Sequence, residues 1–350
     1  MRQLRTWFFV CSIFFLGGFW GLYNGVLTVS RIESLYLQCA GYSGRQRIFC
    51  LQSSFSPYIR SPEVIQGLMR VIETTNMNRQ DSAMPLSLGC HDVGHVIGEV
   101  ASRTDISLGI LVNACGRSCE FGCVHGVITG RVRAKPSLLD QVNELCAARA
   151  GQTLTHIQQI ACHHGVGHVF AELSGYRVAD ALNRCTTLLA KDARSDCASG
   201  VFMEIFRPPT LSHTPISLPE DVIDYCNKIP NEYRFKCIYD GAMVTYTLHK
   251  SLAKGMRVCA QLPDYEKSQC EKAVGGAVYA EVQADPLRIV STCQEVSDQA
   301  LPCILGAIIQ PLVIDPSGKL SLEICAVAGE RFRATCEQEV QNVKASFNAK

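Results

Sequence analysis

The sequence predicts an all-α protein: a disulfide-stapled, solenoid-like array of about nine αα-hairpins behind an N-terminal transmembrane helix. Three observations support this fold class. Cysteines recur every 33 to 40 residues, most of them have a partner spaced to join two consecutive helices, and alternating apolar and polar runs between hairpin turns are lacking. With 350 residues, 47% of them hydrophobic, the chain is long enough to bury a large core.

The amino terminus indicates the compartment. Two arginines precede an uncharged, largely apolar run from Thr6 to Ser30, and about 20 apolar residues suffice to cross a bilayer with the basic flank in the cytoplasm. A long signal peptide that is removed would lead to the same compartment without the anchor. The preferred interpretation is a cytoplasmic stub (1–6), a transmembrane signal anchor (7–29) and an ectodomain in the periplasm or extracellular space (31–350).

The 19 cysteines agree with an oxidising compartment. Cys11 lies in the membrane run, which leaves an even number, 18, for a disulfide framework. Seven predicted disulfides close loops of 10 to 16 residues, and the loop-entropy model gives each about 3 kcal/mol of stabilisation. The predicted pairs are Cys39 with Cys50, Cys146 with Cys162, Cys185 with Cys197, Cys226 with Cys237, Cys259 with Cys270, Cys293 with Cys303, and Cys325 with Cys336.

Each predicted unit has a first and a second helix. First helices are expected at Ser61-Pro62 and Asp285-Pro286, where a capping side chain precedes a proline, and after Pro219. Second helices are expected to begin near the later cysteine of the pair. About one turn further they carry a small residue, such as Gly94 or Gly126, which lets neighbouring helices approach closely.

One part of the chain departs from this pattern. The unit of Cys90 has no cysteine in its first helix, expected from about residue 62 to 76, whereas the next unit has Cys115, Cys119 and Cys123. The remaining pairing joins Cys90 to either Cys115 or Cys119, and Cys123 to the other. In period and in its helix-to-helix disulfides the chain resembles the cysteine-rich, tetratricopeptide-like helical repeats of exported bacterial proteins. The resemblance does not include their alanine and leucine consensus, and it implies no functional residues.

Seven of the nine histidines lie between residues 90 and 172. Two segments there read His-x3-His-x3-Glu, one from His91 to Glu99 and one from His164 to Glu172, and His125 lies between them. Later units keep the cysteine but place other residues where these units have histidine. The helical framework therefore does not require the imidazoles, which favours a functional role for them.

Residues four apart on a helix share a face, with Cβ atoms about 5 to 6 Å apart, so two such histidines can bind one metal ion. The helix that carries His125 is expected between the other two, where His125 can join either pair. One shared pocket is the preferred arrangement, and two separate sites are the alternative. The predicted metal ligands are His91, His95, His125, His164 and His168.

Glu99 and Glu172 follow the first histidine of their segments by eight residues, about 12 Å along a helix axis. One helix therefore cannot easily supply all three ligands to one ion. We predict that these carboxylates bind a second ion, hold an imidazole or act as catalytic proton-transfer groups. Glu204 and Asp240, in second helices of later units, are interpreted as solvated side chains, and the alternative is that they extend the wall of the pocket.

Imidazole and carboxylate ligands predict a transition metal ion as cofactor, with iron, zinc or copper as the candidates. Iron or copper would indicate oxidation chemistry, and zinc with a bound water would indicate hydrolysis. Ligation by Cys119, Cys123 and His125 is an alternative that requires reduced thiols. The sequence lacks the nucleophile elbow, the phosphate-binding loop and the dinucleotide-binding glycine pattern.

The sequence thus favours a membrane-anchored, extracytoplasmic metal-binding protein, with a metal-dependent oxidoreductase or hydrolase as its enzymatic form. One alternative is a repeat scaffold that binds a protein or peptide and in which the histidines are incidental, and another is metal uptake or storage without catalysis. The expected partners are the membrane, through the N-terminal helix, and a protein or small-molecule ligand. The net charge of +1 argues against nucleic acid.

Overall fold

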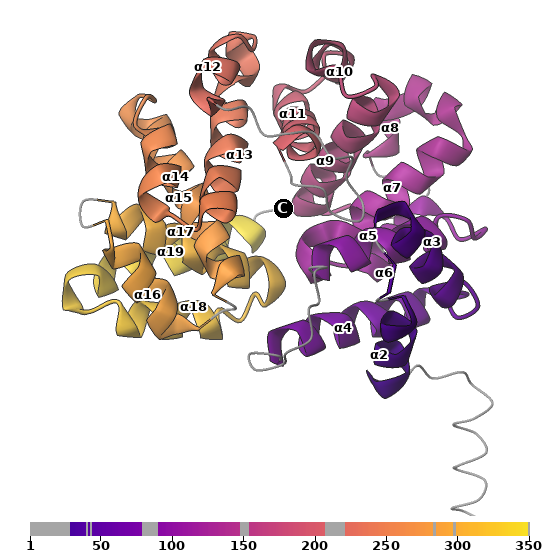
Figure 1. Ribbon diagram of the computed structural model, residues 1–350, viewed down its shortest axis with the longest axis horizontal. Helices are drawn as coiled ribbons and strands as arrows, with labels where there is room; N and C mark the ends of the chain where they lie inside the picture. The colour runs from indigo at the N-terminus through magenta and orange to yellow at the C-terminus, as the bar shows by residue number, and fades with distance from the viewer. Residues whose placement is uncertain are drawn as a thin grey trace, which may run out of the picture.

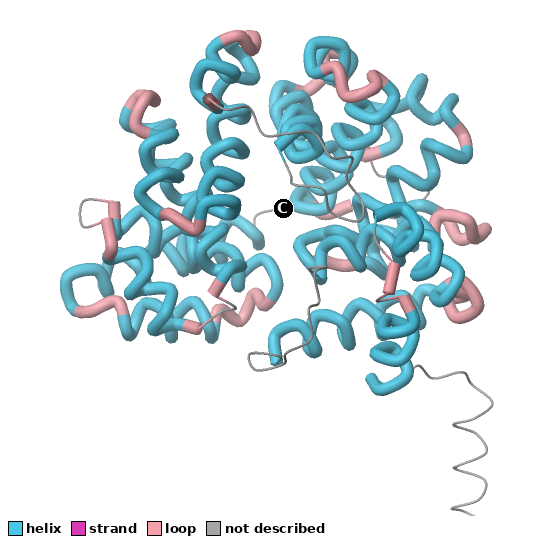
Figure 2. The backbone as a smooth tube through the Cα atoms, viewed as in Figure 1, coloured by secondary structure: helices cyan, strands magenta, loops and turns pink. Residues whose placement is uncertain are grey.

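The computed structural model describes residues 29–39, 41–42, 44–78, 90–147, 154–206, 221–282, 285–296 and 299–348. These residues form helices joined by turns and loops, with no strand among them (Figure 2). The predicted all-α class is therefore confirmed.

Within the described residues, helices alternate in nine successive pairs. The even-numbered, mostly shorter helices are α2 (Val29–Gln38), α4 (Pro62–Asn78), α6 (Leu108–Cys115), α8 (Val142–Leu145), α10 (Val178–Cys185), α12 (Val222–Asn227), α14 (Leu252–Cys259), α16 (Pro286–Gln294) and α18 (Lys319–Val327). The odd-numbered helices are α3 (Gly44–Phe55), α5 (Cys90–Ala101), α7 (Gly122–Ala134), α9 (His156–Leu173), α11 (Lys191–Phe206), α13 (Asn231–His249), α15 (Asp264–Glu281), α17 (Ala300–Ile314) and α19 (Glu330–Asn348). Two 3₁₀ helices, η1 (Ser118–Phe121) and η2 (Pro136–Gln141), flank α7.

Disulfides join the helices as the cysteine spacing predicts. All seven predicted pairs are present. The alternative left open by the sequence is settled as Cys90–Cys119 and Cys115–Cys123. Cys119 and Cys123 therefore have no free thiol, and the hypothesis that they bind a metal together with His125 is wrong for this disulfide-bonded state.

The odd-numbered helices stack on one another in chain order, and most even-numbered helices pack against their own partner (Figure 1). Figure 1 shows the N-terminal helices, indigo to magenta, on one side of the molecule and the C-terminal helices, orange to yellow, on the other. Helix α17 also contacts η1, which connects the two sides. Because a helix inside the stack has neighbours on several sides, ten of the twelve residues of α5 are buried.

Of two predicted details of the units, the cap of one first helix is confirmed and the start of several second helices is wrong. Asp285 caps α16 as expected, because its carboxylate accepts hydrogen bonds from the backbone N–H groups of Leu287 and Arg288. The second helices, however, do not all begin near their cysteine. Helices α9, α11, α13 and α15 each begin six residues before it. The disulfide therefore attaches to the second turn of the helix. The turn before it lengthens the contact of the helix with its neighbours.

Small residues do permit close helix packing. A Cβ added at Gly126 of α7 would overlap the backbone carbonyl of His95 on α5, and one added at Gly98 of α5 would overlap the carbonyl of Cys123. Gly167 on α9 and Gly200 on α11 have the same reciprocal relationship to the facing backbone. The glycines thus bring the histidine-bearing helix α5 against α7, and α9 against α11.

The expected membrane anchor, residues 7–29, lies outside the described residues except for Val29 at the start of α2. Among the helices of the described part, none is both long enough and apolar enough to span a bilayer.

Candidate metal centre

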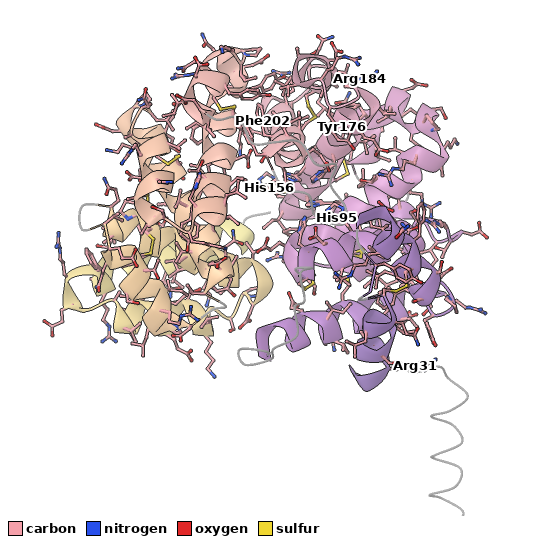
Figure 3. All side chains as sticks on the ribbon, viewed as in Figure 1. Arg31, His95, His156, Tyr176, Arg184 and Phe202 are labelled. Carbon is pink, nitrogen blue, oxygen red and sulfur yellow. A yellow bond between two sulfur atoms is a disulfide. The ribbon has the colours of Figure 1, made fainter. Side chains whose placement is uncertain are left out.

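Three adjacent helices carry the five predicted histidine ligands. Helix α7, which carries His125, packs against both α5 and α9, as the order of the units predicts. Figure 3 labels His95 on α5, within the N-terminal half of the array. Of the five histidines, His91, His95, His125 and His168 are buried and His164 is partly buried.

The five imidazole rings form a single cluster around His125. The ring centroid of His125 lies 4.7 Å from that of His164 and 5.2 Å from that of His168. The centroids of His91 and His95 lie 5.3 and 5.4 Å from it. His95 and His168, from the outer two helices, are themselves 5.4 Å apart. The structure therefore places the two sequence segments together at one location.

Hydrogen bonds orient the first pair. The carbonyl oxygen of Cys119 can only accept, so His91 Nδ1–H donates to it at 3.2 Å. A neutral His91 then has a bare Nε2, to which His95 Nε2–H donates at 3.1 Å. A carbonyl that holds the Nδ1–H of a histidine and leaves its Nε2 for a ligand is the usual support of a metal-binding imidazole.

His125, at the centre of the cluster, has a ring nitrogen whose hydrogen-bonding capacity is not met. Its Nδ1 is buried and has no hydrogen-bond partner among the described residues. Burial, and then the neighbouring rings of His164, His168, His91 and His95, hold the pKa of His125 well below its ordinary value of 6.5. The ring is therefore neutral at physiological pH, which is the form that binds metals.

Helix α11 supports the second pair. His168 Nδ1–H donates to the carboxylate of Glu204 at 2.7 Å, and both side chains are buried. His164 Nε2 lies 3.4 Å from Met203 Sδ. Glu204 thus occupies at His168 the role that the Cys119 carbonyl occupies at His91.

Comparison of the chain with protein families, with curated proteins and with solved structures gives no match. The chemical assignment therefore depends on the geometry of the cluster. Two histidine triads each offer three ligand atoms within 4.8 Å of one another, and they share one residue. The triads are His91, His95 and His125, and His125, His164 and His168.

The two predicted carboxylates meet at an arginine. Arg133 of α7 donates to Glu172 from Nε, which lies 3.0 Å from both carboxylate oxygens, and from Nη2, which lies 2.7 Å from Oε2. Its Nη1 donates to Glu99 Oε1 at 2.9 Å, and Gln52 donates to the other Glu99 oxygen at 2.6 Å. Burial raises the pKa of Glu99, although Arg133 opposes the shift.

A narrow polar pocket borders the cluster on the side of these carboxylates, with room for about one water molecule. Figure 3 labels two of its lining residues, His95 and Tyr176. The pocket therefore has room for a water molecule beside His95 of one triad and His168 of the other. Its lining residues are His95, Glu99, Thr129, Arg133, His168, Glu172, Tyr176 and Glu204.

Sequence reasoning misplaced two acidic residues. The interpretation of Glu204 and Asp240 as solvated is wrong, because α11 and α13 lie inside the stack and both side chains are buried. Glu204 does line the pocket, as the alternative predicts. Glu204 binds His168, and Asp240 accepts a hydrogen bond from Ser199 at 3.1 Å. The cysteine register contains a signal for this region, since Met203 stands six residues after Cys197 as His168 stands six after Cys162.

Proposed function

We propose that this protein binds transition metal ions through its five-histidine cluster. The observation that carries the proposal is the pair of triads that share His125, each with its ligand atoms within 4.8 Å of one another. Later units of the same array lack these histidines, so the fold does not account for them.

The nitrogen positions support this assignment. Two nitrogen ligands about 2.0 to 2.1 Å from a tetrahedral ion lie about 3.3 to 3.4 Å from each other. The Nε2 atoms of His91 and His95 are 3.1 Å apart, so a small ring rotation reaches that geometry. For both Nε2 atoms to bind a metal, His95 would carry its proton on Nδ1 instead of Nε2.

The buried Nδ1 of His125 supports it independently. A buried polar nitrogen without a partner costs about 1 to 3 kcal/mol, and coordination to a metal would remove that cost. Because a neutral His125 offers one unprotonated ring nitrogen and belongs to both triads, it would bind an ion in either triad.

The pocket beside the cluster favours a metal-dependent enzyme as the finer form of this proposal. When bound, the metal would supply a Lewis acid or a redox centre. Arg133 holds Glu99 and Glu172 at the pocket, where these carboxylates would accept a proton from a water molecule or donate one to it. Iron and copper would direct this site to oxidation, and zinc to hydrolysis.

The compartment follows from the disulfides. Nine disulfides in the described residues favour an oxidising environment, so we place the domain from residue 31 onward outside the cytoplasm. In this proposal the apolar residues 7–29 attach it to the membrane.

The test is elemental analysis of the full chain, purified with its disulfides intact and without chelator or histidine tag. We expect stoichiometric iron, zinc or copper in the wild type and its loss in the double variant His91→Ala/His164→Ala, which removes one ligand from each triad. The matched control is His163→Ala/His249→Ala, since His163 is the chain neighbour of His164 and His249 is exposed at the end of α13. Wild-type protein that contains no metal and takes up neither iron, zinc nor copper would overturn the proposal. The repeat scaffold that binds a protein or peptide would then be favoured.

A further inference from the structure

Met203 brings a sulfur atom to the second triad. It lies on α11, and its Sδ is 3.4 Å from Nε2 of His164. Two ligands of one tetrahedral ion, a nitrogen at about 2.0 Å and a sulfur at about 2.3 Å, lie about 3.5 Å from each other. The observed distance therefore fits two atoms that bind the same ion.

Glu204, the next residue of α11, contributes to the same arrangement. Its carboxylate holds Nδ1–H of His168, which leaves Nε2 of His168 as the nitrogen for a metal. One helix thus supplies both the sulfur atom beside His164 and the acceptor that orients His168.

The sulfur distinguishes the two triads. Around His91 and His95 the described contacts are to nitrogen and to the carbonyl oxygen of Cys119. All 18 cysteines of the described residues are in disulfides, so no cysteine there offers a thiolate. Soft thioether ligands select copper(I), whereas an all-imidazole set suits zinc, iron and copper alike.

We infer that His125, His164, His168 and the thioether of Met203 form a copper(I) site. This inference rests on the proposed function, because it requires that the histidine cluster binds a metal. It adds the identity and oxidation state of the ion and a fourth ligand from a helix outside the histidine-rich segments. The protein would then select copper over zinc at this triad.

The test is the copper(I) affinity of the full chain and of Met203→Leu. Copper(I) is supplied without oxygen as its acetonitrile complex, with no thiol present, so that the disulfides persist, and it competes with the chromophoric chelator bicinchoninate. Leucine nearly conserves the side-chain volume, so the fold should persist, and thermal unfolding checks this. Since even outer partners of metal ligands change affinity about 10- to 100-fold, loss of a ligand should weaken copper(I) binding at least about tenfold.

The matched control is Met243→Leu, because Met243 stands six residues after Cys237 as Met203 does after Cys197, and both are partly buried. We expect Met243→Leu to bind copper(I) like the wild type, and Met203→Leu to keep the wild-type affinity for zinc. X-ray absorption of the copper-loaded wild type should show a sulfur neighbour that Met203→Leu lacks.

Two results would overturn the inference in distinguishable ways. A cluster that binds zinc or copper without a sulfur neighbour, and with equal affinity in Met203→Leu, would make the Met203–His164 contact a packing contact of sulfur with an aromatic ring. The proposed metal function would then survive. A wild-type protein that binds neither metal would remove the proposed function and this inference together.

Discussion

Glu204 of α11 accepts a hydrogen bond from His168 Nδ1 of α9 at 2.7 Å, and both side chains are buried. The two residues are 36 positions apart and belong to different units of the array. A buried carboxylate against an imidazole fixes the ring orientation and makes its other nitrogen a stronger ligand.

Replacing Glu204 with glutamine should therefore weaken metal binding. The amide oxygen still accepts the hydrogen bond, but the negative charge is lost, and the expected decrease in affinity is about 10- to 100-fold. Competition with a chromophoric chelator measures the affinity for zinc. Asp240→Asn is the control, since Asp240 is buried on the next odd-numbered helix and binds Ser199. Equal affinities of Glu204→Gln and the wild type would show that Glu204 does not support a ligand.

Gly126→Ala should separate two of the histidine helices. The added methyl group would overlap the His95 carbonyl, so α7 must move away from α5. We expect a loss of about 1 to 3 kcal/mol in the free energy of unfolding, together with weaker metal binding. Gly67→Ala is the control, because its Cβ would meet no atom within 4 Å and alanine stabilises an exposed helix interior by up to about 1 kcal/mol. Denaturant unfolding with and without metal measures both effects, and a variant as stable as the wild type would contradict the close packing.

The sequence predicts seven of the nine disulfides and the histidine cluster because these follow from local spacing. A cysteine pair such as Cys259 and Cys270 is 11 residues apart, a separation that leaves the chain few ways to connect two helices. The position of His125 between its partners follows from the order of the units. These features need only the repeat period, which is visible in the chain.

The residues that surround the cluster are harder to predict. Helix α11 packs on several sides, so its buried residues do not form one apolar stripe, and periodicity does not reveal that Glu204 is buried. Helical periodicity does not reveal Arg133 as the partner of Glu99 and Glu172 either. Yet Arg133 stands ten residues after Cys123, as Glu172 stands ten after Cys162 and Glu99 nine after Cys90. Alignment of the units on their cysteines is the signal that places these side chains at one level.

Removal of the Cys90–Cys119 disulfide should affect both stability and metal binding. The loop-entropy model gives a cost of about 3 to 4 kcal/mol for the double serine variant. This disulfide also holds η1, whose Cys119 carbonyl accepts the hydrogen bond from His91 Nδ1, so the first triad should lose affinity for zinc. The control is the double serine variant of Cys325 and Cys336, which join α18 to α19 at the other end of the array. It should lose about 3 kcal/mol and retain metal affinity. Equal metal affinity in the two variants would mean that η1 does not support the metal site.

Asp196 gives the protein a pH dependence that is independent of the histidines. Burial on α11 raises its pKa from 3.8 to about 6, against the attraction of Lys236. Because the folded protein holds this proton more tightly than the unfolded chain, its contribution to stability is complete below pH 3.8 and is lost as pH rises through about 6.

Asp196→Asn should remove the loss of stability that the wild type shows as pH rises through the pKa of Asp196. At pH 7 the variant is expected to be more stable than the wild type by about 1 to 2 kcal/mol, after allowance for the partial exposure of Asp196, and the difference should shrink toward pH 4. Chemical denaturation at pH 4, 5, 6 and 7 measures it. Glu323→Gln, at an exposed position on α18, should change stability by no more than about 0.5 kcal/mol throughout. A difference between Asp196→Asn and the wild type that does not grow with pH would mean that the Asp196 carboxyl is solvated, and that Lys236 and water together stabilise its charged form.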